Sequence, residues 1–225
     1  MVLFRQWPGA AVWSAGTVAL CGLILLNSGV YLDAGEQPRF LLEKEAWAAR
    51  PWWLPAFYCH VAGASVCLAA GTPLMFPAFT RRHPRWHRIL GYVYLNAVLW
   101  LAAPAGLVLA LSAKGGLAGT LGFSVAGVLW WRSTWLGYRA IRRGDVAAHV
   151  REMVRSYSWA LSAPAFRVIQ AGLYLSGLDD ATNYVVSLWL SVAVSVCLAE
   201  SCLYRGRHSA LGQLAGRSPI AGVVP

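Results

Sequence analysis

The stretch RRHPRWHRILGYVY (residues 81–94) begins with a cluster of four arginines and two histidines and continues directly into a long apolar segment. A basic cluster of this kind indicates a nucleic-acid contact, a metal site or the cytoplasmic end of a membrane helix. The apolar residues from 89 to 112 are numerous enough to cross the roughly 30 Å hydrocarbon layer at about 1.5 Å per residue. The stretch therefore predicts a membrane helix with its basic end in the cytoplasm.

The composition of the whole chain agrees with a single integral membrane domain over residues 1–225. Of these 225 residues, 58% are hydrophobic and only 12% are charged, and the mean hydropathy is +0.51. A soluble domain of this length needs far more charge to cover its surface. The net charge of +10 comes from short clusters between apolar runs, without the pattern of a nucleic-acid-binding protein. We therefore expect the lipid bilayer, and no nucleic acid, as a partner.

Six apolar segments are each long enough to span the bilayer, which predicts an all-α, six-helix transmembrane bundle. The first segment lacks a clear cleavage site and is expected to be a retained helix. The Gly-rich tail over residues 205–225 is expected to be loose. The predicted spans cover residues 10–30, 54–79, 89–112, 117–138, 156–176 and 184–204.

The distribution of basic residues predicts the orientation of this bundle. With the N-terminus in the cytoplasm, thirteen of the 19 Lys and Arg residues fall on the cytoplasmic side and four on the outer side. Cytoplasmic loops carry the excess of Lys and Arg, so both termini are predicted to be cytoplasmic. In the first external loop, the amphipathic stretch FLLEKEAWAARPWW (residues 40–53) predicts a short helix lying in the outer interface.

Ionisable side chains inside a bilayer are costly, so each needs a partner or a role. Arg132 and Glu200 lie at similar depth in the fourth and sixth predicted spans and have opposite charges. We expect a structural ion pair between them. Arg132 could instead extend to the inner headgroups.

A second polar group is predicted in the outer half of the membrane. His60 lies near the outer end of the second span, and Arg167 and Gln170 lie in the outer half of the fifth, beyond a predicted kink at Pro164. No acidic residue of the spans lies at that depth to neutralise Arg167. These three residues are candidate ligand-binding residues. In the alternative interpretation, backbone carbonyls and water satisfy them.

A third group lies at the cytoplasmic ends of the third and fifth spans. His87 and Tyr94 share one helical face, as do His149 and Met153. Paired imidazoles on neighbouring helices could hold a b-type haem, so these four are candidate cofactor-binding residues. Two alternatives remain open, a transition metal or a basic surface facing lipid phosphate. The five cysteines show no C-x-x-C spacing, and no metal cluster is expected from them.

The segments HPRWHRILGYVY (83–94) and DVAAHVREMVRSYSWALSAPAFRV (145–168), with His60, resemble a family of bacterial multi-pass membrane proteins known as domain of unknown function 2306. The resemblance covers roughly residues 55–205 and implies the membrane fold, without a reaction. A weaker similarity to b-type membrane cytochromes rests on architecture. Because the fourth span has no histidine, that similarity implies at most one haem.

Two functions are expected from these observations. The first is a bundle of redox type in the bacterial inner membrane, which binds a ligand or cofactor and at most one haem b. The second is a small transporter or accessory subunit that binds an anionic or lipid ligand, as a homo-oligomer or within a membrane complex. Hydrolase motifs such as H-E-x-x-H and G-x-S-x-G are absent from the sequence, and no catalytic residue is assigned.

Overall fold

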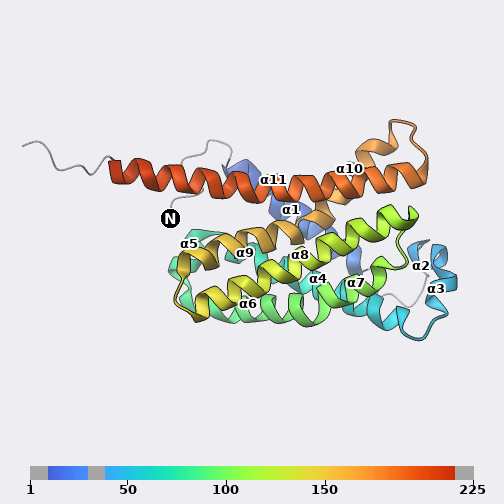
Figure 1. The fold of residues 1–225 in the computed structure, drawn as a ribbon, viewed down its shortest axis with the longest axis horizontal. Coiled ribbons are helices and arrows are strands. Elements are labelled where there is room, and N and C mark those ends of the chain that lie inside the picture. Colours follow the sequence, from blue (N-terminus) through green and yellow to red (C-terminus); the bar gives the residue numbers. More distant parts are fainter. Residues whose placement is uncertain (1–9, 30–38, 216–225) are drawn as a thin grey trace, which may run out of the picture.

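The computed structural model describes residues 10–29 and 39–215, and all of its elements in these ranges are helices (Figure 1). The N-terminal part contains α1 (Ala10–Gly29), α2 (Arg39–Glu43), α3 (Glu45–Ala48), α4 (Trp53–Leu74) and α5 (Pro77–Arg82). The middle contains α6 (Pro84–Asn96), the π-helix η2 (Ala97–Ala102), α7 (Ala103–Ala110) and α8 (Gly116–Arg142). The C-terminal part contains α9 (Val146–Ala160), α10 (Ser162–Tyr174) and α11 (Asp180–Ala215).

Each of the six apolar segments of the sequence lies in one of the long helices or helix pairs. Within the described ranges, three helical stretches are long and apolar enough to cross a membrane, namely Trp53–Leu74, Pro84–Ala110 and Asp180–Arg205. The protein is therefore an all-helical membrane protein. Helix α11 continues through Ala215, into the tail that the sequence predicts to be loose; the last ten residues of that tail lie outside the described residues.

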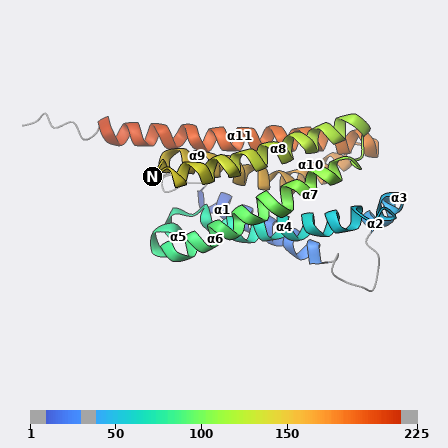
Figure 2. The same cartoon turned by 60° about the horizontal axis from the view of Figure 1, so that its bottom comes forward.

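The helices form two groups that Figure 2 shows one above the other. Helices α8, α9, α10 and α11 lie in one group, and α1, α4, α5 and α6 lie in the other. Contacts between α7 and α8, and between η2 and α8, join the two groups. The buried core lies along this junction and includes Cys67, Tyr94, Val98, Trp130 and Tyr157.

Close packing of α4 against the helix that follows α5 depends on small residues. A Cβ atom on Gly63 would lie 2.9 Å from the backbone nitrogen of Ala102, and one on Gly71 would lie 2.9 Å from the ring of Tyr94. Cys67, one turn from each glycine, is fully buried. The spacing of these three small residues allows the backbones to approach closely.

Pro104 explains the π-helix in the middle of the third long helix. The backbone N–H of Ala103 donates to Val98, five residues back. In this register the carbonyl of Leu99 faces Pro104, which has no N–H to donate. The indole Nε1–H of Trp131 donates to the Leu99 carbonyl instead, at 3.2 Å. A side chain from α8 therefore satisfies a backbone group that the proline leaves without a partner.

The fifth predicted span is also interrupted near a proline, by the break between α9 and α10. Helix α9 ends at Ala160, and α10 begins two residues later. Pro164 occupies the first turn of α10, where a missing N–H costs little because the first turn has no intrahelical acceptor. The sequence correctly placed a kink near Pro164, and the structure shows that it divides the span into two helices.

Candidate functional site

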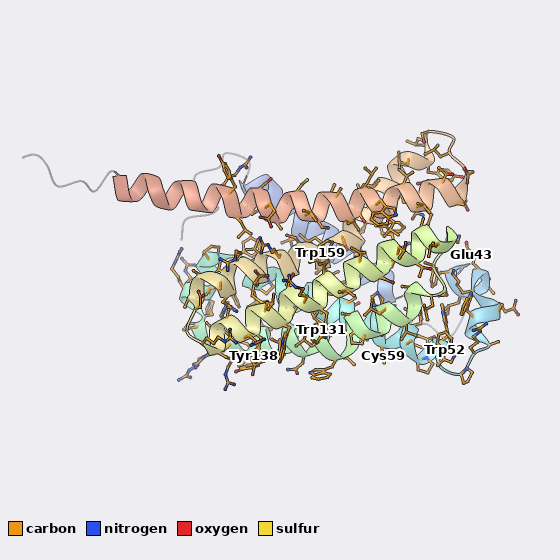
Figure 3. All side chains as sticks on the ribbon, in the orientation of Figure 1. Glu43, Trp52, Cys59, Trp131, Tyr138 and Trp159 are labelled. Atoms are coloured by element: carbon orange, nitrogen blue, oxygen red, sulfur yellow. The ribbon has the colours of Figure 1, made fainter. Side chains whose placement is uncertain are left out.

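The candidate site is a cavity of about 550 Å³, within the size range of small-molecule sites. Its lining includes Glu43 of α2 and Trp159 of α9. Figure 3 shows Glu43 at the end of the bundle that carries α2 and α3, and Trp159 near the middle. The cavity therefore extends from that end of the bundle into its interior.

His60 lines this cavity and is held in one orientation. Its Nδ1 atom lies 2.8 Å from the carbonyl oxygen of Ala102, the last residue of η2. A carbonyl only accepts, so Nδ1 carries the proton and donates it to this bond. A Cβ atom on Gly106 would lie 2.9 Å from Nδ1, so the glycine leaves the space that the ring occupies. The remaining ring nitrogen, Nε2, is the one left to contact another group.

Arg167 and Gln170 of α10 line the same cavity as His60. The Arg167 guanidinium lies 5.9 Å from the ring centroid of Phe166. Within the described part of the chain, no ion pair includes Arg167. The backbone carbonyl of Gln170 accepts a hydrogen bond from Nδ2 of Asn183, at 3.3 Å. The structure thus brings together the three residues of the predicted outer group, and their role in ligand binding stays a prediction.

One end of the cavity is lined by Phe40, Glu43, Lys44 and Trp53 of a segment that we call the roof, residues 39–53, which contains α2, α3 and the first residue of α4. Glu43 Oε2 lies 2.5 Å from Nζ of Lys114, which precedes α8. Lys44 donates through Nζ to the carbonyl of Ser112, and the indole Nε1–H of Trp53 donates to the Ser112 hydroxyl at 2.9 Å. These contacts dock the roof onto the turn between α7 and α8.

Sequence reasoning missed the roof residues as part of the site. It counted Lys44 and Lys114 only as outer charges, and it found no acidic residue near Arg167 within the spans. In the structure, Glu43 and Asp180 line the same cavity as Arg167. A charged residue in a loop gives no sequence signal for the helix end against which it docks, so only the tertiary arrangement identifies these contacts.

The docking of the roof depends on pH through Lys44, which is 9% exposed. Burial lowers the pKa of the Lys44 ammonium, the charge of Lys114 lowers it further, and Glu43 raises it. The undocked segment therefore binds this proton more tightly than the docked segment does. Docking becomes more favourable as the pH rises from the docked pKa toward the ordinary value near 10.5.

We expect fluorine NMR of protein containing fluorotryptophan to show this titration at Trp53. As the pH rises toward the ordinary lysine pKa near 10.5, the Trp53 signal should move toward its docked position, because loss of the Lys44 proton removes the cost of burying that charge. Lys44→Met should abolish the dependence, and Trp53→Phe assigns the signal. A Trp53 signal that moves identically in wild type and Lys44→Met would contradict this account.

The inner half of the core contains a closed circuit of hydrogen bonds, which we call the Trp130 circuit. The indole N–H of Trp130 donates to the Tyr94 hydroxyl at 3.2 Å, and the Tyr94 and Ser156 hydroxyls are 2.9 Å apart. Ser156 and Thr134 are 2.6 Å apart, and Thr134 donates to the carbonyl of Trp130 at 2.8 Å. Because the indole only donates and the carbonyl only accepts, each hydroxyl donates once and accepts once. Tyr94, 1% exposed, is therefore a satisfied core residue.

The other predicted cofactor residues lie on α6 and α9, with the two histidines near the N-terminal ends of these helices. His87 and His149 are close enough to interact electrostatically. The His87 Nδ1 atom lies 3.1 Å from the hydroxyl of Thr80, and the His149 Nδ1 atom lies 2.9 Å from the carbonyl of Gly137. A Cβ atom on Gly137 would lie 2.7 Å from the sulfur of Met153, which places that side chain between α8 and α9.

None of His87, Tyr94, His149 and Met153 lines the outer cavity. In the described ranges, no group of three or more His, Cys, Asp or Glu side chains is arranged to hold a metal ion. A haem held by His87 and His149 stays a prediction, which an absorption spectrum of the purified protein tests. Of the candidate cofactor residues, Tyr94 fits that role least, because its hydroxyl is already committed to the Trp130 circuit.

The expected ion pair between Arg132 and Glu200 was wrong. Glu200 lies 2.8 Å from Nε of Arg155, and Arg155 also lies 2.9 Å from the buried Glu152. Arg132 is exposed on α8. Similar depth in the membrane did not identify the partner of Glu200, because depth does not show which face of its helix a residue occupies. The face of α8 that contacts α9 carries buried small residues, and Arg132 lies outside that face.

The helices form a helical membrane protein with a cavity that reaches one end of the bundle and is lined in part by polar side chains. A family model described as a predicted membrane protein, DUF2306, matches residues 57–203, and the chain belongs to this family. Comparison with the curated proteins and with the solved structures finds no match. The family resemblance is thereby confirmed, whereas the similarity to b-type cytochromes has no support from these comparisons.

Proposed function

We propose that this protein is a six-span bundle of the bacterial inner membrane that binds a small amphipathic molecule in its outer cavity. Both termini are assigned to the cytoplasm, because that orientation puts the arginine-rich helix ends inside. The roof then lies at the outer interface, where its tryptophans are at headgroup level. Assembly with further copies or with another membrane protein stays a prediction.

The observation that carries this proposal is the single cavity shared by His60, Arg167 and Gln170. These polar residues come from α4 and α10, which are far apart in the sequence. Polar side chains in a membrane protein that converge on one cavity are the usual sign of a ligand or transport site. A binding role, alone or as part of transport, is therefore better supported than a redox role.

The rest of the cavity wall supports an amphipathic ligand. The lining also includes large apolar side chains, namely Leu68, Phe123, Trp130, Trp159, Leu188 and Val192. A ligand that fills the cavity therefore needs an apolar body and a polar head. The apolar body gains from leaving water, by about 25 cal/mol per Å² of apolar surface buried.

We expect the purified protein, in a nonionic detergent, to bind one equivalent of tritiated hexadecanol saturably. Ala64→Phe should reduce this binding at least about tenfold, because Ala64 lines the cavity and a phenyl ring would fill part of it. Ala62→Phe is the matched control, since Ala62 is exposed on the same helix and does not line the cavity. Equal binding by the two variants, or no saturable binding by wild type, would reject the proposal.

A further inference from the structure

We propose that the ligand of the outer cavity is a single-chain amphiphile with an anionic oxygen head group, which is bound between Lys44 and Arg167. This inference rests on the proposed function and adds the charge class of the ligand. The shared chemistry is an acyl or alkyl chain ending in a carboxylate or phosphate. A free fatty acid and a single-chain anionic phospholipid of the outer leaflet both present that chemistry.

The charges that line the cavity do not balance. Three cationic side chains line it, those of Lys44, Lys114 and Arg167, against two acidic ones, Glu43 and Asp180. Glu43 neutralises Lys114 through their ion pair. Among the residues that the structure describes, neither Lys44 nor Arg167 has a carboxylate within ion-pair distance. One positive charge therefore remains even after Asp180 is counted.

The position of these two cations makes the imbalance costly. Lys44 is almost completely buried, and its ammonium has a neutral partner, the carbonyl of Ser112. Arg167 lies on α10, which we assign to a membrane span. A cation in such surroundings gains much more from an anion than from a neutral acceptor, because charge-assisted hydrogen bonds are about twice as strong as neutral ones.

The location of the two cations also fixes how such a ligand lies. Lys44 belongs to the roof, so the head group lies at the outer end of the cavity. The chain then points inward to the aromatic wall formed by Phe123, Trp130 and Trp159. This arrangement keeps the charged head close to the headgroup region and buries the chain. A cationic amphiphile is disfavoured, because its head would face Lys44 and Arg167.

The experiment compares probes of equal chain length by competition against tritiated palmitate, in nonionic detergent at about pH 8. Unlabelled palmitate and hexadecyl phosphate should each compete at least about tenfold better than hexadecanol, since a hydrogen bond to a charged group contributes about 1.5–3 kcal/mol. Phosphatidylglycerol is included as the two-chain bilayer lipid. Competition by the two single-chain anions and none by phosphatidylglycerol indicates a free amphiphile, whereas strong competition by phosphatidylglycerol would overturn the single-chain assignment.

The variants test whether the preference depends on the two cations. Arg167→Gln and Lys44→Gln should each reduce the preference for palmitate over hexadecanol to less than about threefold. Arg132→Gln is the matched control, because Arg132 is also assigned to a span but does not line the cavity, and it should keep the full preference. If Arg167→Gln fails to fold, Lys44→Gln still tests the roof cation.

The outcomes separate the two proposals. Equal binding of palmitate and hexadecanol by wild type would overturn the anionic assignment and leave the proposed cavity function standing. Binding of neither probe would reject the proposed function itself. A preference for palmitate that survives in both Arg167→Gln and Lys44→Gln would show that other residues select the anion, and would overturn the inference.

Discussion

Gly63→Leu is expected to destabilise the protein by about 3 kcal/mol, because it places a large side chain where two helices are almost in backbone contact. At Gly63, α4 approaches η2 so closely that a Cβ atom would lie 2.9 Å from both the backbone nitrogen of Ala102 and the Cβ of Leu101. The atoms in the way belong to the backbone or lie next to it, so no side-chain rotation relieves the clash. The two helices must separate, and the buried contacts beside them are lost.

Thermal unfolding in detergent, followed by size-exclusion chromatography, measures this effect. For a chain of this size, a loss of about 3 kcal/mol lowers Tm by roughly 6–12 °C. Ala62→Leu is the control, because the neighbouring Ala62 is exposed and an added isobutyl group meets lipid or detergent there. Similar Tm values for the two variants would mean that α4 and η2 are farther apart than the structure shows.

Ser156→Ala is expected to destabilise the protein by about 1–3 kcal/mol, because it opens the Trp130 circuit. The Tyr94 hydroxyl loses the oxygen to which it donates, and the Thr134 hydroxyl loses its donor. Both groups are buried, so water does not replace the lost bonds. Ser158→Ala is the control, since the Ser158 hydroxyl donates only to the Val154 carbonyl of its own helix.

A double-mutant cycle with Tyr94→Phe separates a circuit from independent bonds. In a circuit, the first substitution already breaks the sequence of donors and acceptors, so the second adds less than its individual effect. Tm values of the single and double variants in the same detergent give the coupling. Strict additivity of Ser156→Ala and Tyr94→Phe would contradict the cooperative arrangement.

The positions of the long helices were predictable from the sequence because they depend on local properties. Apolar runs of sufficient length, interrupted by basic clusters and tight turns, indicated every long helix. The four-residue spacing of Gly63, Cys67 and Gly71 is also a local property, and such a row of small residues is typical of a close helix contact. Six membrane crossings and cytoplasmic termini remain predictions. In the described part of the chain, three helical stretches are long and apolar enough to cross a membrane.

The outer group of polar residues was predictable in part. Depth alone placed His60 and Arg167 in the same half of the membrane, and the structure places both on one cavity. Depth failed for Glu200, because the nearest cation depends on helix rotation and neighbour order. The roof was missed for a related reason, since the contact between Lys44 and Ser112 joins two loops that are 68 residues apart.

The π-helix before Pro104 also determines the rotational phase of the chain beyond it. An α-helix turns by about 100° per residue, so one additional residue in a turn rotates all later side chains by that angle. If the same residues formed a regular α-helix, Ala105 would stand where Gly106 now faces the imidazole of His60, and the methyl group of Ala105 would occupy the space of the ring. A proline that only appears to interrupt a helix thus keeps a glycine opposite the histidine.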